Sequence, residues 1–275
     1  MEKSFISQVE EGERFGFGEN WSHFLKTIDE SRINIAVDSL AAMLMTKDLK
    51  GKSFIDVGSG SGLSSLAAYR MGANVFSFDF DKNSVACTQT LRAKYKTDQQ
   101  TNSWEVKEGS VLDADFVNSL GKFDIVNSWG VLHHTGDMYK AFENVCTLCN
   151  SGSLLFIAIY DDWGTASKVW RFIKKLYNKN VVGRTVVKLC CVPYYILRGL
   201  ASDIKHMKNP VKRYTEFKSS RGMSFYYDLI DWIGGYPYEV ATPAQLEAYF
   251  TEKGFRVINT KYKAAPCNEV VFQKL

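Results

Sequence analysis

Residues 54–62 read Phe54-Ile55-Asp56-Val57-Gly58-Ser59-Gly60-Ser61-Gly62, an apolar run of strand character followed by a turn with three glycines. Glycine lets the backbone approach a ligand closely, and a helix that begins after such a turn offers amide donors to a carboxylate or phosphate. A dinucleotide-binding turn needs a third glycine three residues after the second, and Leu63 stands there instead. The turn therefore predicts an α/β ligand site of another cofactor class.

Short apolar runs alternate with stretches of helical spacing on the C-terminal side of this turn, which predicts a parallel sheet with right-handed crossovers. Strands are expected at residues 53–57, 74–78, 103–107, 123–127 and 153–159, with two closing strands at 255–262 and 268–273. Helices are expected near residues 61–71, 82–95, 113–120 and 138–149, and one or two more within the first fifty residues. Gly72, Gly121 and Gly152 are expected to end helices.

An acid at the end of the first strand followed by GxGxG resembles class I S-adenosylmethionine-dependent methyltransferases. The next strand ends in Asp79, whose carboxylate can accept two ribose hydroxyls, although an Asx cap for the following helix is the alternative. Ser110 stands where the family often has Asp. The resemblance implies S-adenosylmethionine as cofactor, held by Asp56, Gly58, Ser59, Gly60, Gly62, Asp79, Phe80, Ser110, Val111, Ser128 and Trp129.

The family resemblance implies a Rossmann-like α/β fold. We expect a seven-stranded, mostly parallel sheet with helices on both faces, N-terminal helices, and a helical lid inserted after the fifth strand. The expected divisions are an N-terminal helical cap (1–49), a cofactor-binding core (50–160), a basic lid (161–240), and a C-terminal helix and strand pair that complete the sheet (241–275).

Candidate catalytic residues follow the fourth and fifth strands, at the edge where open α/β sheets bind ligands. His134, with His133 as the second choice, is expected to act as a base or to orient an acceptor hydroxyl. In the alternative interpretation both histidines cap a turn or bind the backbone. Tyr160 and Asp161 are the other candidates, since an acid there could be the base or bind an amine.

Two further classes of site are disfavoured. Methyltransferases that act on nucleobases or protein amides often carry paired prolines after the fourth strand, and Asn127-Ser128-Trp129-Gly130 has none. No metal is expected, because Asp161 and Asp162 lack a convincing third ligand. Cys146 and Cys149 form an isolated CxxC, which we interpret as helix packing.

The basic charge is concentrated in residues 161–222, which hold fourteen Lys and Arg against four acids, although the whole chain is only +4. A basic amphipathic helix is expected over Lys168–Tyr177 and a more apolar one over Val181–Ala201, which charged residues interrupt too often for a membrane span. These helices could close a pocket, lie on anionic lipid, grip a phosphate, or be a solvated face. Neutralising Lys174, Lys175, Lys212 and Arg213 is expected to impair an anionic acceptor or membrane docking, and not cofactor affinity.

The acceptor is expected to be a small hydroxylated molecule, such as a free, nucleotide-linked or lipid-linked sugar or a phenol or quinone, and it could be anionic. N-methylation of an amine, or a catalytically silent cofactor-binding protein that docks to a membrane or partner, are the alternatives. Candidate acceptor-binding residues are Trp21, Tyr227, Asp231, Tyr236, Tyr238 and Glu239. Nucleic acid is not expected, since no binding module accompanies the charge. Six scattered cysteines and a polar N-terminus predict a reduced, cytoplasmic chain; the oligomeric state is not predicted.

Overall fold

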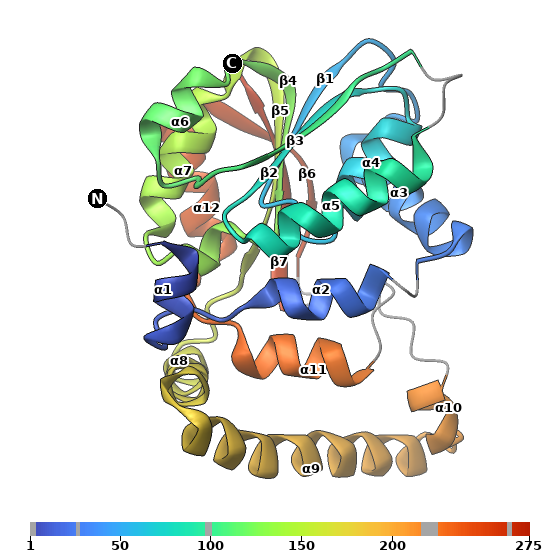
Figure 1. The fold of residues 1–275 in the computed structure, drawn as a ribbon, viewed down its shortest axis with the longest axis vertical. Coiled ribbons are helices and arrows are strands. Elements are labelled where there is room, and N and C mark those ends of the chain that lie inside the picture. The colour runs from blue at the N-terminus through green and yellow to red at the C-terminus, as the bar shows by residue number, and fades with distance from the viewer. Residues whose placement is uncertain (1–3, 26–27, 97–100, 216–224, 263–265) are drawn as a thin grey trace.

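The computed structural model describes residues 4–25, 28–96, 101–215, 225–262 and 266–275. Within them the strands form one seven-stranded sheet in the order β3-β2-β1-β4-β5-β7-β6 (Figure 1). Strands β1 to β5 are parallel, and β7 runs antiparallel to both β5 and β6. The strands are β1 Ser53–Val57, β2 Asn74–Asp79, β3 Trp104–Glu108, β4 Phe123–Trp129, β5 Cys149–Tyr160, β6 Phe255–Lys261 and β7 Cys267–Lys274. The predicted fold class is confirmed.

Helices cover both faces of the sheet and extend beyond one edge of it (Figure 1). They are α1 Phe5–Glu10, α2 Phe17–Leu25, α3 Glu30–Leu44, α4 Leu63–Arg70, α5 Lys82–Tyr95, α6 Ala114–Ser119, the 3₁₀ turn η1 Leu132–His134, α7 Met138–Thr147, α8 Thr165–Lys179, α9 Val181–Lys205, α10 Pro210–Thr215, α11 Phe225–Gly234 and α12 Pro243–Glu252. Thr242 and Gln245 form a capping box at the start of α12.

The prediction for residues 146–152 was wrong in detail. Helix α7 ends at Thr147, and Cys149 is the first residue of β5, where it pairs with Phe123. The Ser153 hydroxyl accepts from the Asn150 amide and donates to the Phe123 carbonyl, at 2.9 and 2.7 Å. Gly152, with φ of 86°, therefore lies in an irregular stretch of β5 and does not end a helix.

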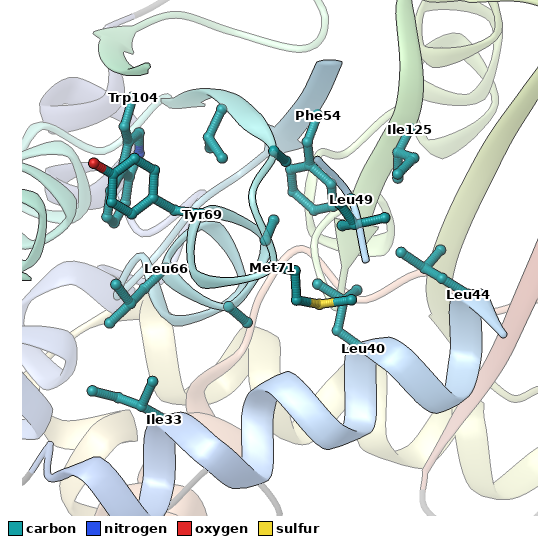
Figure 2. Close-up of a cluster of buried hydrophobic side chains, with 14 of the residues drawn as sticks. Ile33, Leu40, Leu44, Leu49, Phe54, Leu66, Tyr69, Met71, Trp104 and Ile125 are labelled. Carbon is teal, nitrogen blue, oxygen red and sulfur yellow. The ribbon is translucent and has the colours of Figure 1, made fainter. Parts of the chain in front are cut away.

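One hydrophobic cluster joins the N-terminal helices to the sheet (Figure 2). Ile33 and Leu40 of α3 pack toward α4, whose Tyr69 is fully buried beside Trp104 with ring centroids 5.5 Å apart. The Trp104 indole donates to the Ser77 hydroxyl at 2.9 Å, so its polar atom is satisfied inside the core. A second cluster on the other face joins the sheet to α7 and α12. Helix α3 and the end of α2 are therefore packed on the sheet.

Helices α8 to α11, which belong to the segment expected to form a lid and are called the lid below, lie beyond the carboxyl edge of the parallel strands (Figure 1). Helices α2 and α11 contact each other there, and α8 and α9 pack against α11 from the outer side. Phe15 joins a small apolar core with Tyr177, Val187 and Ile233, so residues before the sheet help to hold the lid. Among the described residues, no helix combines the length and apolar character that crossing a membrane requires.

Candidate functional site

A cavity of about 800 Å³ opens between the carboxyl ends of the parallel strands and the lid. It is lined by residues that follow β1 to β5, together with residues from α2, α11 and β7. This is the position at which open α/β sheets bind ligands, and the volume is near the upper end for ligand pockets. The predicted site residues at its wall are Trp21, Asp56, Gly58, Ser59, Gly60, Asp79, Phe80, Ser110, Val111, Trp129, His133, His134, Tyr160 and Asp231.

Gly58 and Gly60 of the glycine turn have positive φ angles and little room for a side chain. Gly58 has φ of 78°, and a Cβ there would lie 2.3 Å from the Val131 side chain. Gly60 has φ of 53°, and a Cβ there would lie 3.2 Å from the Trp21 indole nitrogen. The amides of Gly58 and Ser59 donate to the Phe78 carbonyl at 2.9 and 3.0 Å. The turn is thereby fixed to the end of β2 with its backbone at the cavity wall.

Asp79 joins this turn to the end of β2. Its Oδ2 accepts from the Gly60 amide and its Oδ1 from the Asp81 amide, both at 2.9 Å. Burial raises the pKa of Asp79 to about 7, although both hydrogen bonds lower it. The cap of α5 is Asp81, which accepts from Asn83 and from Gly18. The helix-cap alternative for Asp79 is therefore wrong, and its carboxylate faces the cavity.

Asp56 holds the ends of β1 and β4 together from within the core. Its carboxylate accepts from the Ser65 hydroxyl at 2.5 Å and from Asn127 Nδ2 at 2.8 Å, and desolvation raises its pKa. Asn127 lines the cavity, and its Oδ1 has no hydrogen-bond partner among the described residues. This buried oxygen is thus an acceptor that a ligand could satisfy.

His134 is oriented by the lid. Its Nδ1 lies 2.6 Å from the Pro237 carbonyl oxygen. Because a carbonyl only accepts, Nδ1 carries the proton in the neutral ring and Nε2 carries the lone pair. Arg14 donates to the carbonyls of His134 and Thr135 at 2.6 and 2.9 Å and so holds the η1 turn. His134 therefore contacts the backbone, as one half of the alternative interpretation expects, but its partner is a carbonyl 103 residues away and it does not cap the η1 turn.

His133 packs differently. Its ring is fully buried, with its centroid 4.0 Å from that of Tyr160 and 4.4 Å from that of His134. Tyr160 also packs edge-on against His134 and Trp232. The two histidines and Tyr160 thus form one aromatic wall, in which His134 has the ring nitrogen best prepared to accept a proton.

Several predicted site residues do not line the cavity in the part of the chain that the structure describes. Gly62 caps α4, and a Cβ there would lie 3.0 Å from Thr88. Ser128 is fully buried between strands, where its hydroxyl donates to the Val57 carbonyl at 3.0 Å. Asp161 accepts from Asn268 Nδ2 at 3.0 Å. These residues support the loops around the cavity.

The expected acceptor-binding residues at 236–239 also lie outside the cavity lining that the structure describes. Glu239 accepts from the amides of Gly136 and Met138, at 3.1 and 3.2 Å, and so anchors the start of α7. Tyr238 is buried behind Tyr160, and the Tyr236 carbonyl accepts from the Phe15 amide. The side chain of Tyr227 lies outside the described residues.

The acceptor side of the cavity contains residues that the sequence analysis missed. Asp228 joins Asp231 on α11, Glu269 comes from β7, and Trp163, Tyr195 and Trp232 supply aromatic surface. Arg14, Phe17 and Lys261 also line the cavity. No local motif marks them, because they come from six separate segments that only the folded chain brings together.

The CxxC cysteines lie in the core. Cys149 is buried and Cys146 is half-buried, and desolvation raises the pKa of the two thiols to about 12 and about 11. Within the described residues, no group of three His, Cys, Asp or Glu side chains gathers as metal ligands would.

Two of the four lid cations expected to meet an anionic partner are already engaged. Lys174 is fully buried, donates to the Trp232 carbonyl, and lies over the rings of Trp232 and Tyr238 at 4.4 and 4.9 Å. Desolvation lowers its pKa to about 7, and Asp231 opposes that shift. Arg213 donates to both carboxylate oxygens of Asp203 at 2.6 Å. The expectation that Lys174 faces a partner was therefore wrong, whereas Arg213, whose side chain is 33% exposed, keeps the expectation as a prediction.

Replacing Lys174 by alanine is expected to lower the free energy of unfolding by about 2–4 kcal/mol, because the change leaves a cavity and an unsatisfied buried carbonyl. Lys175→Ala is the matched control, since Lys175 is the exposed neighbour, and a change within about 0.5 kcal/mol is expected for it. Urea unfolding of both variants makes the comparison. Equal losses would show that Lys174 does not hold the lid.

Comparison with known proteins agrees with this architecture. A family model described as a methyltransferase domain matches residues 28–259. Ubiquinone biosynthesis O-methyltransferases of Coxiella burnetii and Ralstonia nicotianae are 29% and 30% identical over 111 and 115 residues, which cover 40% and 41% of this chain. Those matches span 44% and 45% of the relatives, less than half of their length.

Solved structures share the fold. Magnesium protoporphyrin IX methyltransferase of Synechocystis PCC 6803, with bound SAH, superposes with a TM-score of 0.54 and 15% identity over 94% of both chains. The mitomycin 7-O-methyltransferase MmcR gives a TM-score of 0.52 and 15% identity, over 99% of this chain and 61% of that chain. The family match shows that this chain belongs to the methyltransferase-domain family, and the solved structures show that it shares the fold of these methyltransferases.

Proposed function

We propose that this protein O-methylates a small hydroxylated acceptor, with His134 as the base. The observation that carries the proposal is the orientation of His134, because the contact of Nδ1 with the Pro237 carbonyl favours the tautomer that has its lone pair on Nε2. His134 and the glycine turn line the same cavity. A neutral hydroxyl is a poor nucleophile, so a positioned base contributes directly to its methylation.

The residues of the cavity fit S-adenosylmethionine, which supplies a methyl group on a good leaving group. Gly58 and Gly60 let the backbone approach a ligand, and the Asp79 carboxylate offers acceptors for two ribose hydroxyls. The unsatisfied Asn127 Oδ1 offers an acceptor for an amino group. Trp21 and Phe80, from α2 and the end of β2, add aromatic surface beside the turn.

The acceptor part of the cavity supports a neutral, ring-shaped molecule. Trp163, Tyr195 and Trp232 offer flat surfaces to a sugar or phenol ring. Asp228, Asp231 and Glu269 can accept from hydroxyl groups, and their charge disfavours an anionic group at this point. The negative field also favours the neutral form of an acceptor hydroxyl, which increases the need for His134.

N-methylation of an amine is the second candidate, and the same three acids favour it. Carboxylates bind an ammonium group well, and the nitrogen becomes nucleophilic once a base removes its proton. Under this alternative, Asp231 would position the amine beside His134.

A turnover screen with matched acceptors tests the proposal. Purified protein is given S-adenosylmethionine and pairs of sugars or phenols that differ only in hydroxyl or amine, and S-adenosylhomocysteine release is measured. Preference for the hydroxyl members supports O-methylation, and preference for the amines overturns it. Calorimetric binding of S-adenosylmethionine and S-adenosylhomocysteine without any turnover would instead support a catalytically silent binding protein. If neither binds at micromolar concentration, the proposed methyltransferase activity is overturned.

The raised pKa of Asp79 makes cofactor affinity depend on pH. A ligand that requires the ionised carboxylate must displace a proton below the pKa of about 7, so affinity is expected to fall about tenfold from pH 8 to pH 6. Calorimetry at both pH values measures the change. Asp79→Asn serves as the control, since it should bind weakly and with no such dependence. A flat profile for the unaltered protein would contradict the role of Asp79.

A further inference from the structure

Helix α9 presents a continuous apolar row on its outer face. The row follows helical spacing, and its side chains are 37–70% exposed: Val182, Val186, Leu189, Leu197, Leu200 and Ile204. On α8, which packs against α9, Val169 and Phe172 are also exposed. Figure 1 shows α9 as the outermost element of the lid. Exposed apolar side chains contiguous over a helix of 25 residues mark an interaction surface.

The opposite face of α9 packs inward. Val187 joins the lid core with Tyr177, and the Tyr195 hydroxyl accepts from the Trp232 indole at 2.9 Å while Tyr195 lines the cavity. Gly183 brings α9 close to α8, since a Cβ there would lie 2.2 Å from the Leu176 carbonyl oxygen. The inner face of α9 therefore supplies its contacts to the lid core, and the outer row does not take part in that core.

Positive charge borders this row. Between Thr165 and Arg213 the chain has twelve Lys and Arg and a single acid, Asp203, which is engaged by Arg213. Most of the remaining cations have exposed side chains on or between α8 and α10: Lys168, Arg171, Lys175, Lys179, Arg184, Arg198, Lys205, Lys208 and Lys212. An apolar stripe with a cationic border is typical of helices that lie in the interface of an anionic membrane.

We propose that the outer face of α8 and α9 docks on an anionic lipid bilayer. Charge selects this occupant: a second copy of the chain would bring like charges together, which is costly, whereas anionic headgroups neutralise them. The apolar row would enter the boundary between headgroups and acyl chains. Because Tyr195 lines the cavity from the inner face of α9, docking would bring the acceptor site within about one helix diameter, roughly 10 Å, of the membrane.

Vesicle co-sedimentation tests the proposal with the full chain. Binding is expected to vesicles of phosphatidylcholine with 30% phosphatidylglycerol and to fall at least tenfold with pure phosphatidylcholine or at 0.5 M salt. The double variant Leu189→Asp, Leu197→Asp is expected to lose at least tenfold in vesicle affinity. Met45→Asp is the matched control, because Met45 is 60% exposed, close to the exposure of Leu197, but lies at the end of α3, and it should bind as the unaltered protein does.

A charge-reversal variant measures how much the positive charges contribute to vesicle binding. Lys175→Glu, Lys179→Glu and Lys205→Glu together are expected to abolish the preference for anionic vesicles. No binding by the unaltered protein, or equal binding by the Leu189, Leu197 variant, would overturn the proposal. So would analytical ultracentrifugation showing a dimer that this variant dissociates, since the face would then be an interface between two copies. Calorimetry with S-adenosylmethionine is run on each variant, and its outcome is independent of docking.

Discussion

Replacing His134 by alanine is expected to lower kcat by about 10²–10⁴-fold while leaving the affinity for S-adenosylmethionine unchanged. The alanine removes Nε2, the acceptor prepared by the Nδ1 contact to the Pro237 carbonyl. The glycine turn and Asp79 lie on other segments of the cavity wall and keep their own hydrogen bonds. Initial rates at saturating cofactor and calorimetric titration of the variant give the two quantities.

A control variant at a second histidine shows whether the loss of kcat is specific to His134. His206 is exposed at the end of α9, so His206→Ala should leave kcat within a factor of about two. His134→Gln retains an uncharged polar side chain without a comparable proton acceptor and should be nearly as slow as the alanine variant. Full turnover by His134→Ala would remove this residue from the role of base and leave the cofactor proposal intact.

The strands and helices of the sheet domain were predictable because they depend on local sequence patterns. Strand and helix periodicity located the elements of the sheet within a few residues, and the glycine turn and Asp79 are adjacent to strand ends in the sequence itself. The exception at Cys149 arose because apolar periodicity alone does not separate the last turn of a helix from the first residue of a buried strand. Pairing with Phe123 decides between them, and that contact is not local.

The acceptor side of the cavity was less predictable because its residues are assembled by tertiary contacts. Arg14 reaches the backbone of His134 across 120 positions of the sequence, and Glu269 enters from the last strand. Lys174 has the sequence environment of a solvated cation but is buried under aromatic rings from α11 and the segment after it. Conversely, Ser128 adjoins a site residue and points into the core, since successive side chains of a strand face opposite sides.

The second large effect is expected on cofactor affinity when Asp79 is replaced. Replacing it with alanine is expected to weaken S-adenosylmethionine and S-adenosylhomocysteine binding about 100-fold or more, because two charge-assisted hydrogen bonds to a ligand are lost, each worth about 1.5–3 kcal/mol. Calorimetry measures both affinities. Asp113→Ala is the matched control, since Asp113 caps α6 outside the cavity lining and should change stability by about 1 kcal/mol without changing affinity.

The raised pKa of Asp79 also predicts the opposite effect on stability, which distinguishes a ligand-binding carboxylate from a structural one. Since folding raises the pKa of this group to about 7, its contribution to stability is complete below its unfolded pKa of about 4 and is lost as the pH rises through 7. At pH 8 the ligand-free Asp79→Asn variant should therefore be at least as stable as the unaltered protein while binding the cofactor poorly. If thermal unfolding shows Asp79→Asn to be clearly destabilised at pH 8, the carboxylate is a structural tie between Gly60 and Asp81, and its charge serves the fold more than the cofactor.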